Sequence, residues 1–183
     1  MKSATEKAGW PHTQYPEVAF GGRSNVGKSS LMNNLLQRKG LVKTSGEPGK
    51  TRLLNFFLIN EKFVLTDLPG YGFARGDKDE IRRWKPMVEE YITGKEELKA
   101  LVHIVDIRRS PDELEKTMME FAINAGVPHI LVANKSDKLS NPACAESARK
   151  IEKTLGKKPI IYSAKTGAGK DALWRELLPL LHG

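Results

Sequence analysis

Short apolar runs alternate with longer segments of helical periodicity along the chain. Runs bounded by Gly, Pro or polar positions predict buried strands, and they cover residues 17–21, 53–59, 62–66, 100–105, 127–133 and 159–162. The pair Asn60-Glu61 lies between the second and third runs and predicts a hairpin that joins them.

The segments between these runs carry apolar residues at the three- and four-residue spacing of a helix. The first begins at Lys28 and ends at Gly40, and its predicted buried face consists of Leu31, Leu35 and Leu36. The second has Ile81, Trp84, Val88 and Tyr91 on one face. Pro86 lies inside this second segment and is expected to kink the helix or to begin a new one.

Capping residues indicate where the later helices begin. Ser110 is the predicted N-cap of one helix, because Pro111 follows in the first turn and acidic residues come next. Asn141-Pro142 starts the next helix. A closing helix covers residues 170–181, and its predicted inward side chains are Leu173, Leu177, Leu178 and Leu181.

Alternation of buried strands with helices predicts the fold class. Near-continuous apolar strands separated by helices are typical of an α/β protein with a mostly parallel sheet and helices on both faces. We expect one domain over residues 16–183, preceded by an N-terminal extension over residues 1–15. Ligands of such sheets bind beyond the carboxyl ends of the strands, which is where the motifs below fall.

The first motif is GRSNVGKS at residues 22–29, between a predicted strand and a predicted helix. It matches the P-loop pattern, whose backbone amides surround phosphate oxygens at a helix N-terminus. Lys28 is expected to bridge the β- and γ-phosphates, and the Ser29 hydroxyl to ligate Mg²⁺. The predicted phosphate-binding set is Gly22, Arg23, Ser24, Asn25, Val26, Gly27, Lys28, Ser29 and Ser30.

Two further segments are expected at the γ-phosphate. Asp67-Leu68-Pro69-Gly70 follows a predicted strand, so Asp67 can hold Mg²⁺ while the Gly70 N–H meets the γ-phosphate. The loop with Gly49-Lys50-Thr51 contains the candidate switch threonine, whose hydroxyl is expected to reach Mg²⁺. The predicted metal ligands are Ser29, Thr51 and Asp67, and the predicted catalytic residues are Lys28, Thr51 and Gly70.

Two loops near the C-terminus predict that the base is guanine. Asn134-Lys135-Ser136-Asp137 follows one strand, and its Asp can accept hydrogen bonds from guanine N1–H and N2–H₂, which adenine lacks. Asn134 is expected to tie this loop to the P-loop, and Lys135 to lie along the base. Ser163-Ala164-Lys165 follows the last strand, where the Ala164 N–H can meet guanine O6.

Charge suggests a polyanionic partner. The chain has 30 Lys and Arg against 22 Asp and Glu, a net charge of +8, which favours nucleotides, nucleic acid or an acidic membrane surface. A basic segment follows the Asp67–Gly70 motif and is a candidate RNA-phosphate contact, with a solvated helix face as the alternative: Arg75, Lys78, Arg82, Arg83 and Lys85. Trp84 fits the apolar face of this helix, which favours a core position over base stacking.

Other features favour a soluble, cytoplasmic protein. Cys144 is the single cysteine, so no internal disulfide can form. No apolar stretch approaches the roughly 18 residues of a membrane span, and the first residues lack the apolar segment of a signal peptide.

These motifs resemble the translation-factor-related GTPases and, within them, the EngB (YihA/YsxC) family of bacterial ribosome-assembly GTPases. The resemblance begins near Pro16 and rests on EVAFGGRSNVGKSSLMN, SGEPGKTRLLNFF, DLPGYGFA and VDIRRSP. It implies a six-stranded sheet whose antiparallel edge strand is residues 53–59. NKSD departs from the Thr-Lys-x-Asp variant that is typical of the family.

The resemblance also implies the biology. It implies a cytoplasmic monomer that uses GTP and Mg²⁺ and assists maturation of the large (50S) ribosomal subunit, with rRNA and ribosomal proteins as partners and with links to cell division and septation. Two other classes stay open on the residues: a GTPase signalling module with a protein effector, and a nucleotide kinase or ATPase. The guanine-reading loops disfavour the second.

Two residues raise questions of mechanism. Tyr71 stands where many GTPases carry the Gln that orients the attacking water, so we expect slow hydrolysis by the free protein; a single-turnover rate above roughly 0.1 s⁻¹ would contradict this.

Asn25 resembles the K⁺-ligating Asn of some related GTPases, although it can instead stiffen the loop. Equal activity in K⁺ and Na⁺ buffers would exclude the cation.

Overall fold

The computed structural model describes residues 2–4, 6–38, 40–42, 53–72 and 78–182, with only the backbone for 78–81. Its strands are β1 (Lys2–Ala4), β2 (Glu17–Gly22), β3 (Leu54–Ile59), β4 (Phe63–Asp67), β5 (Leu98–Asp106), β6 (His129–Asn134) and β7 (Ile160–Ile161). Its helices are α1 (Lys28–Leu35), α2 (Lys78–Gly94), α3 (Glu113–Asn124), α4 (Asn141–Leu155) and α5 (Lys170–His182), with 3-10 turns η1 (Lys7–Gly9) and η2 (Ser136–Lys138).

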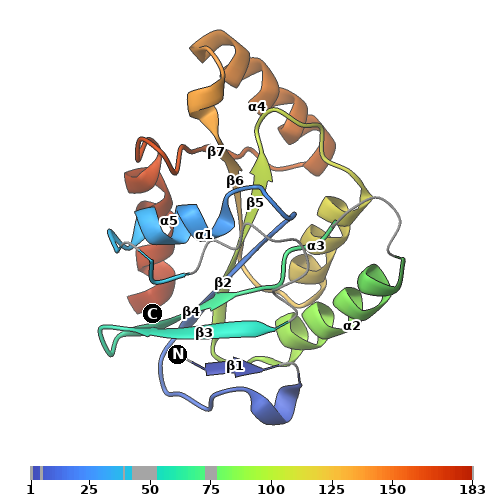
Figure 1. Cartoon of the computed structure of the whole chain (residues 1–183), viewed down its shortest axis with the longest axis vertical. Coiled ribbons are helices and arrows are strands. Elements are labelled where there is room, and N and C mark those ends of the chain that lie inside the picture. The colour runs from blue at the N-terminus through green and yellow to red at the C-terminus, as the bar shows by residue number, and fades with distance from the viewer. Residues whose placement is uncertain (1, 5, 39, 43–52, 73–77, 183) are drawn as a thin grey trace.

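All seven described strands form one sheet in the order β1-β3-β4-β2-β5-β6-β7 (Figure 1). Strands β4, β2, β5, β6 and β7 pair in parallel, and β3 runs antiparallel to both of its neighbours. The predicted α/β class with a mostly parallel sheet is confirmed.

The sheet has one strand more than the resemblance implied. Strand β1 lies within the predicted N-terminal extension and pairs with β3, so β3 is the second strand and not the edge. Only three residues pair, and the Ser3 hydroxyl donates to the Asn55 side chain at 2.7 Å. Such a short strand has no periodicity of its own, and the available edge of β3 decides its conformation.

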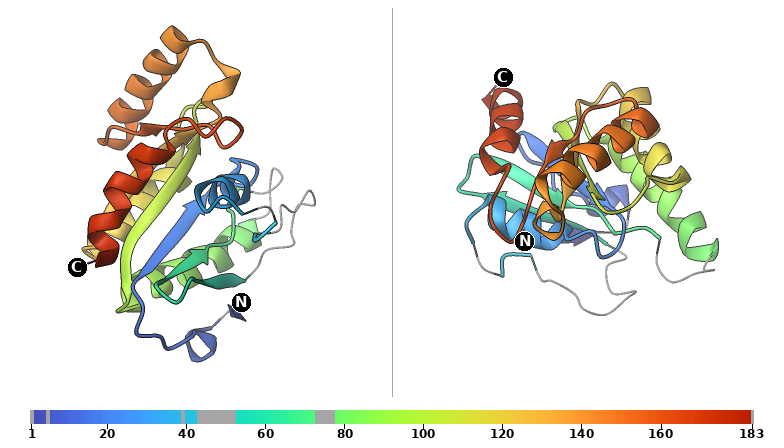
Figure 2. Two further views of the ribbon diagram at one scale, coloured as in Figure 1. Left: turned by 90° about the vertical axis from the view of Figure 1, so that its left-hand side faces the viewer. Right: turned by 90° about the horizontal axis from the view of Figure 1, so that it is seen from above.

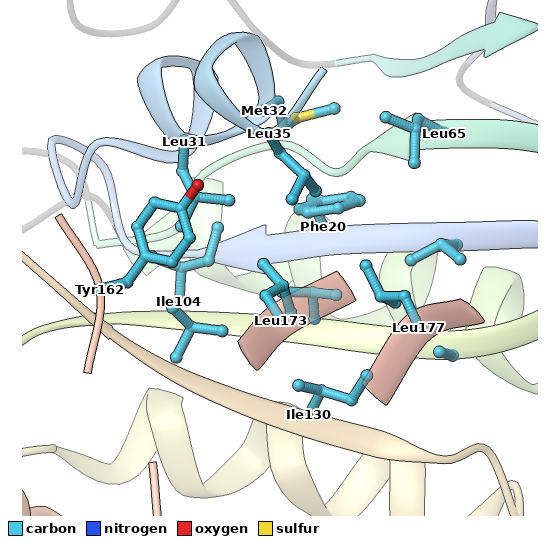
Figure 3. Close-up of a cluster of buried hydrophobic side chains, with 14 of the residues drawn as sticks. Phe20, Leu31, Met32, Leu35, Leu65, Ile104, Ile130, Tyr162, Leu173 and Leu177 are labelled. Atoms are coloured by element: carbon cyan, nitrogen blue, oxygen red, sulfur yellow. The ribbon is translucent and has the colours of Figure 1, made fainter. Parts of the chain in front are cut away.

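Helices cover both faces of the sheet. Helices α1 and α5 pack on one face, whereas α2, α3 and α4 supply the buried side chains of the other. Figure 2, right, shows α5 and α2 on opposite sides of the strands. In the first core, Leu31 and Leu35 of α1 and Leu173 of α5 lie around strand residues such as Phe20 and Ile104 (Figure 3). Leu178 was predicted to be buried but is 44% exposed, because the inward stripe of α5 follows Leu173 and Leu177.

Two helix boundaries differ from the sequence prediction. Helix α1 ends at Leu35, before Gly40, because Gln37 has a φ of 53° and the Asn33 side chain bonds both backbone groups of Val42. Helix α3 is capped by Asp112 and not by Ser110. Asp112 accepts from the amides of the first turn, while the Glu115 carboxylate accepts from the Asp112 N–H at 2.6 Å, which completes a capping box.

The remaining turns follow the sequence more closely. Helix α2 runs through Pro86, so no new helix begins there. Pro86 lies on the exposed side of the helix. The Asn60-Glu61 hairpin is confirmed, with φ of 50° and 55° at these residues and a bond from Lys62 N to Ile59 O of 3.0 Å.

Within the described part of the chain, no helix is long and apolar enough to span a membrane.

Candidate nucleotide-binding site

Four predicted motifs meet at one edge of the sheet. Gly22 is the last residue of β2, Asp67 of β4 and Asn134 of β6, while Ser163 follows shortly after β7. These strands are mutually parallel, so their carboxyl ends lie together. The fold therefore brings together side chains that are more than 100 positions apart in the sequence. The carboxyl ends of the parallel strands are where α/β proteins bind ligands.

The P-loop turns tightly between β2 and α1. Gly27 is the N-cap of α1 with a φ of 91°, and a Cβ added there would lie 2.6 Å from the Asn134 amide nitrogen. Asn25 has a φ of 66°, a conformation that Asn tolerates better than most residues; whether Asn25 also ligates K⁺ stays a prediction. The first amides of α1 have no helical partners, which is the arrangement that binds phosphate.

The predicted phosphate and magnesium residues are in contact. The Lys28 amine forms an ion pair with the Asp67 carboxylate, and the two residues are only 9% and 4% exposed. A Lys ammonium has three N–H donors, so it can keep this carboxylate and also bind phosphate oxygens. Ser29 follows Lys28, and the two oxygen donors, its hydroxyl and the Asp67 carboxylate, are of the kind that Mg²⁺ prefers. Among the described residues there is no cluster of three or more His, Cys, Asp or Glu that could hold a metal ion.

Backbone bonds attach the Asp67–Gly70 loop to the P-loop. Ser24 N donates to Tyr71 O at 2.8 Å, and Tyr71 N donates to Gly22 O at 3.4 Å. Trp84 of α2 is 5% exposed, and its indole N–H donates to Pro69 O at 3.0 Å. The core position predicted for Trp84 is confirmed, and this bond joins α2 to the loop.

Tyr71 points into the protein. Its side chain is 2% exposed, and its hydroxyl lies 2.9 Å from His103 Nε2 on β5. Burial raises the pKa of Tyr71 well above its usual value, so the phenol stays protonated. The ring is therefore held in the core.

Asn134 joins three of the loops. Its amide nitrogen donates to Val26 O at 2.9 Å, and its amide oxygen accepts from Ala164 N at 3.1 Å. The predicted tie between this loop and the P-loop is thus present. Lys135 continues it, because its amine donates to Asn25 O.

Asp137 is prepared to accept hydrogen bonds. Its carboxylate accepts from the Ser163 hydroxyl at 2.8 Å, and this bond lowers the pKa of Asp137 below its usual value. The Asp is therefore ionised at neutral pH and presents only acceptors. Ser136 and Lys165 lie beside these groups in the same two loops. Gly49, Lys50 and Thr51 of the predicted switch loop, and Arg75 of the basic segment, lie outside the described residues.

Sequence reasoning missed an acidic residue behind the P-loop. Asp106 ends β5 and receives the Lys135 amine at 3.0 Å and the Arg108 guanidinium at 2.7 Å. Although burial raises it, hydrogen bonds from Arg108 and Lys135 hold the pKa of Asp106 at about 2. Asp106 lies at the carboxyl end of a buried strand, as Asp67 does, and this position in the sequence could have identified it as a candidate site residue.

A second missed group is Glu115 on α3. Asp106 and Glu115 line a cavity of about 130 Å³ on the α3 side of the P-loop. Burial raises the pKa of Glu115 to about 7, against the opposing charges of Arg23 and Arg109. Arg23 also pairs with Asp112, the cap of α3. Through Arg23, the P-loop is therefore attached to the N-terminus of α3.

Comparison with known proteins agrees with this geometry. A family model described as 50S ribosome-binding GTPase matches residues 17–135, a span that includes the P-loop and the Asp67–Gly70 motif. A probable GTP-binding protein EngB of Desulfatibacillum aliphaticivorans is 46% identical over 184 residues, which cover 98% of this chain and 89% of that protein. The chain belongs to the EngB family of GTP-binding proteins.

Solved structures extend the comparison. The crystal structure of a probable EngB protein is similar with a TM-score of 0.71 and 27% identity, covering 91% of this chain and 98% of that one. A structure of Era in complex with MgGDPNP and nucleotides 1506–1542 of 16S ribosomal RNA has a TM-score of 0.70 and 25% identity, covering 93% of this chain and 58% of Era. As a P-loop GTPase of the EngB family, the protein binds and hydrolyses GTP. The roles of its individual site residues stay predictions.

Proposed function

We propose that this protein is a GTP-driven switch that assists assembly of the large (50S) ribosomal subunit in the cytoplasm. The observation that carries the proposal is a pair of exposed arginines, Arg82 and Arg83, on the helix joined to the loop expected to contact the γ-phosphate. The matching family model is that of 50S ribosome-binding GTPases, and the related Era was crystallised with ribosomal RNA. A net charge of +8 favours the same class of partner.

In this proposal the phosphates of GTP lie on the P-loop amides. Lys28 bridges the β- and γ-phosphates, and the Gly70 N–H meets the γ-phosphate. Ser29 and Asp67, together with Thr51 from the switch loop, would hold Mg²⁺, which neutralises charge on the phosphates when bound. Asp67 already contacts Lys28, so phosphate binding and metal binding involve one connected set of side chains.

The base is proposed to lie between the Asn134–Asp137 loop and the Ser163–Lys165 loop. Asp137 accepts from guanine N1–H and N2–H₂, and Ala164 N–H donates to O6. The bond from Ser163 to Asp137 supports this assignment, because it orients the carboxylate and lowers its pKa. Lys135, fixed by Asn25 O and Asp106, would lie along the plane of the base.

Hydrolysis by the free protein is proposed to be slow. The burial of Tyr71 supports this, since the residue after Gly70 supplies no group to orient water. A partner that completes the site would then couple GTP hydrolysis to a step of ribosome assembly.

The nucleotide state is proposed to reach the partner through α2. The γ-phosphate would hold Gly70, and the Trp84 bond to Pro69 O connects that loop to the helix that carries Arg82 and Arg83. A change in the loop on hydrolysis would therefore shift the basic surface of α2 relative to RNA phosphates.

Co-sedimentation with ribosomal subunits tests the proposal. We expect the protein to sediment with large subunits more strongly with a non-hydrolysable GTP analogue than with GDP, and less strongly as salt rises, because phosphate contacts release counterions. The double variant Arg82→Ala/Arg83→Ala should weaken this association several-fold while GTP binding is unchanged. The matched control is Arg149→Ala/Lys153→Ala, two exposed basic residues on α4.

Two results would contradict the proposal. Equal sedimentation with GDP and with the analogue would exclude the switch. Equal losses in the α2 and α4 variants would show that total charge, and not the α2 surface, attracts the RNA.

A further inference from the structure

Ser24 has a hydroxyl without a hydrogen-bond partner at the centre of the nucleotide site. Its Oγ is buried, and it makes no hydrogen bond with any described group. A buried hydroxyl without a partner destabilises the fold, and a functional role or a partner that is bound only part of the time explains such a group.

The hydroxyl lies where the P-loop touches the Asp67–Gly70 loop. A Cβ added to Gly70 would lie 3.0 Å from Ser24 Oγ and 3.4 Å from Ser24 N. Ser24 N in turn donates to Tyr71 O at 2.8 Å. The two segments expected to enclose the γ-phosphate therefore meet at Ser24.

The side chains next to Ser24 do not reach the contact between the P-loop and the Asp67–Gly70 loop. Tyr71 is turned into the core by its bond to His103, and Gly70 has no side chain. The Arg23 side chain is engaged by Asp112. Within the described part of the chain, Ser24 thus supplies the side-chain hydroxyl nearest to the contact between the two loops.

We propose that the Ser24 hydroxyl donates a hydrogen bond to a γ-phosphate oxygen of GTP and makes the site prefer GTP over GDP. The inference rests on the nucleotide site proposed above and gives Ser24 a role that backbone amides of the P-loop do not have. GDP lacks the accepting group, so the hydroxyl stays without a partner in that state. A hydrogen bond to a charged group is stronger than a neutral one, which makes the bond sensitive to the presence of the γ-phosphate.

The variant Ser24→Ala tests this proposal, because it removes only the hydroxyl and adds no atom near Gly70. We expect its affinity for a non-hydrolysable GTP analogue to fall at least about tenfold, the loss typical of a bond to a charged group. Its affinity for GDP should stay within about twofold of wild type, and its thermal stability should not fall. The control is Ser140→Ala, which removes an exposed hydroxyl that makes no capping bond at the start of α4.

Each alternative gives a different result. An unchanged ratio of GTP-analogue to GDP affinity would overturn the role of Ser24 and leave the site intact. Ser24 also lines the 130 Å³ cavity; if its hydroxyl binds a structural water there, Ser24→Ala should lower stability and both affinities together, which would also overturn the proposal. Failure of the wild-type protein to bind GDP would instead contradict the nucleotide site itself.

Discussion

At the scale of single residues, the bond that ties Asn134 to the P-loop could be predicted from residue type and position alone. Asp137, Asn134 and Ala164 occur in short motifs; in the structure Asn134 bonds Val26 O and Ala164 N, and Asp137 bonds the Ser163 hydroxyl, while their contacts with guanine stay predictions. Asp106 and Glu115 were missed because their environment, and not their local sequence, determines their state. Burial and neighbouring charges set the pKa of Asp106 at about 2 and that of Glu115 at about 7, and both depend on chain segments far away.

Guanine selectivity belongs to this residue scale. In Asp137→Asn the amide oxygen can still accept from one guanine donor, but the other guanine donor loses its acceptor and faces the amide N–H₂, a like donor. We expect GDP affinity to fall about tenfold or more. A xanthine nucleotide, which has a carbonyl at position 2, should bind the variant better than the wild type, as measured by competition titration.

Comparing the affinities of Asp137→Asn for guanine and xanthine nucleotides controls for misfolding, because a misfolded variant would bind neither. Asp171→Asn, an exposed change in the first turn of α5, should leave both affinities unchanged. If Asp137→Asn kept the wild-type preference for guanine, the base would have to lie elsewhere.

Turns and caps decide the elements. Periodicity predicted the β3–β4 hairpin, whereas the end of α1 and the cap of α3 were set by Asn33, Gln37 and Asp112 through local bonds. Such bonds compete with continued helix at similar energies. A pattern of apolar residues alone therefore places an element better than it places its ends.

The hairpin allows a stability prediction at this scale. Asn60 and Glu61 both have positive φ, as a type I′ turn requires, and Asn-Gly is the preferred pair there. Glu61→Gly removes the cost of a side chain in the left-handed region. We expect the free energy of unfolding to rise by about 1 kcal/mol and the Tm by about 2–4 °C, measured by thermal and urea unfolding.

The same substitution in a helix is the matched control. Glu152→Gly lies at an exposed position inside α4 and should destabilise by about 1 kcal/mol. Equal effects at the two positions would mean that loss of charge, and not backbone conformation, determines the result.

At the scale of the whole molecule, the sheet buries titratable groups on neighbouring strands. His103 of β5 and His129 of β6 lie with Nδ1 and Nε2 3.2 Å apart, and His103 also contacts Tyr71. Burial lowers the pKa of His103 to about 3 and that of His129 to about 4, from 6.5. At these two histidines the unfolded chain therefore binds more protons than the folded chain between about pH 3 and 6.5.

These pKa values predict how stability depends on pH. The contribution of neutral His103 is fully present above pH 6.5 and is lost as pH falls toward about 3. Glu115, with its pKa raised to about 7, acts in the opposite direction as pH rises, so variants must be compared. We expect the urea midpoint of wild type to fall more steeply between pH 7 and pH 4 than that of His103→Gln.

The exposed His12 provides the control for this measurement. His12→Gln should keep the wild-type pH dependence. A His103→Gln profile parallel to that of the wild type would show that His103 is not held neutral in the fold.

The sequence by itself determined the fold class, the place of the P-loop and the choice of guanine. These depend on periodicity and on residues that act within a few positions of each other, such as Gly27 beside Lys28. Only the tertiary structure decided the pairing of β1 with β3, the contact of Ser24 with Gly70, and the bonds of Tyr71 to His103 and of Lys135 to Asp106. Each joins segments that only the folded sheet brings together, and burial between them sets the hydrogen bonding and the pKa values that no single segment carries.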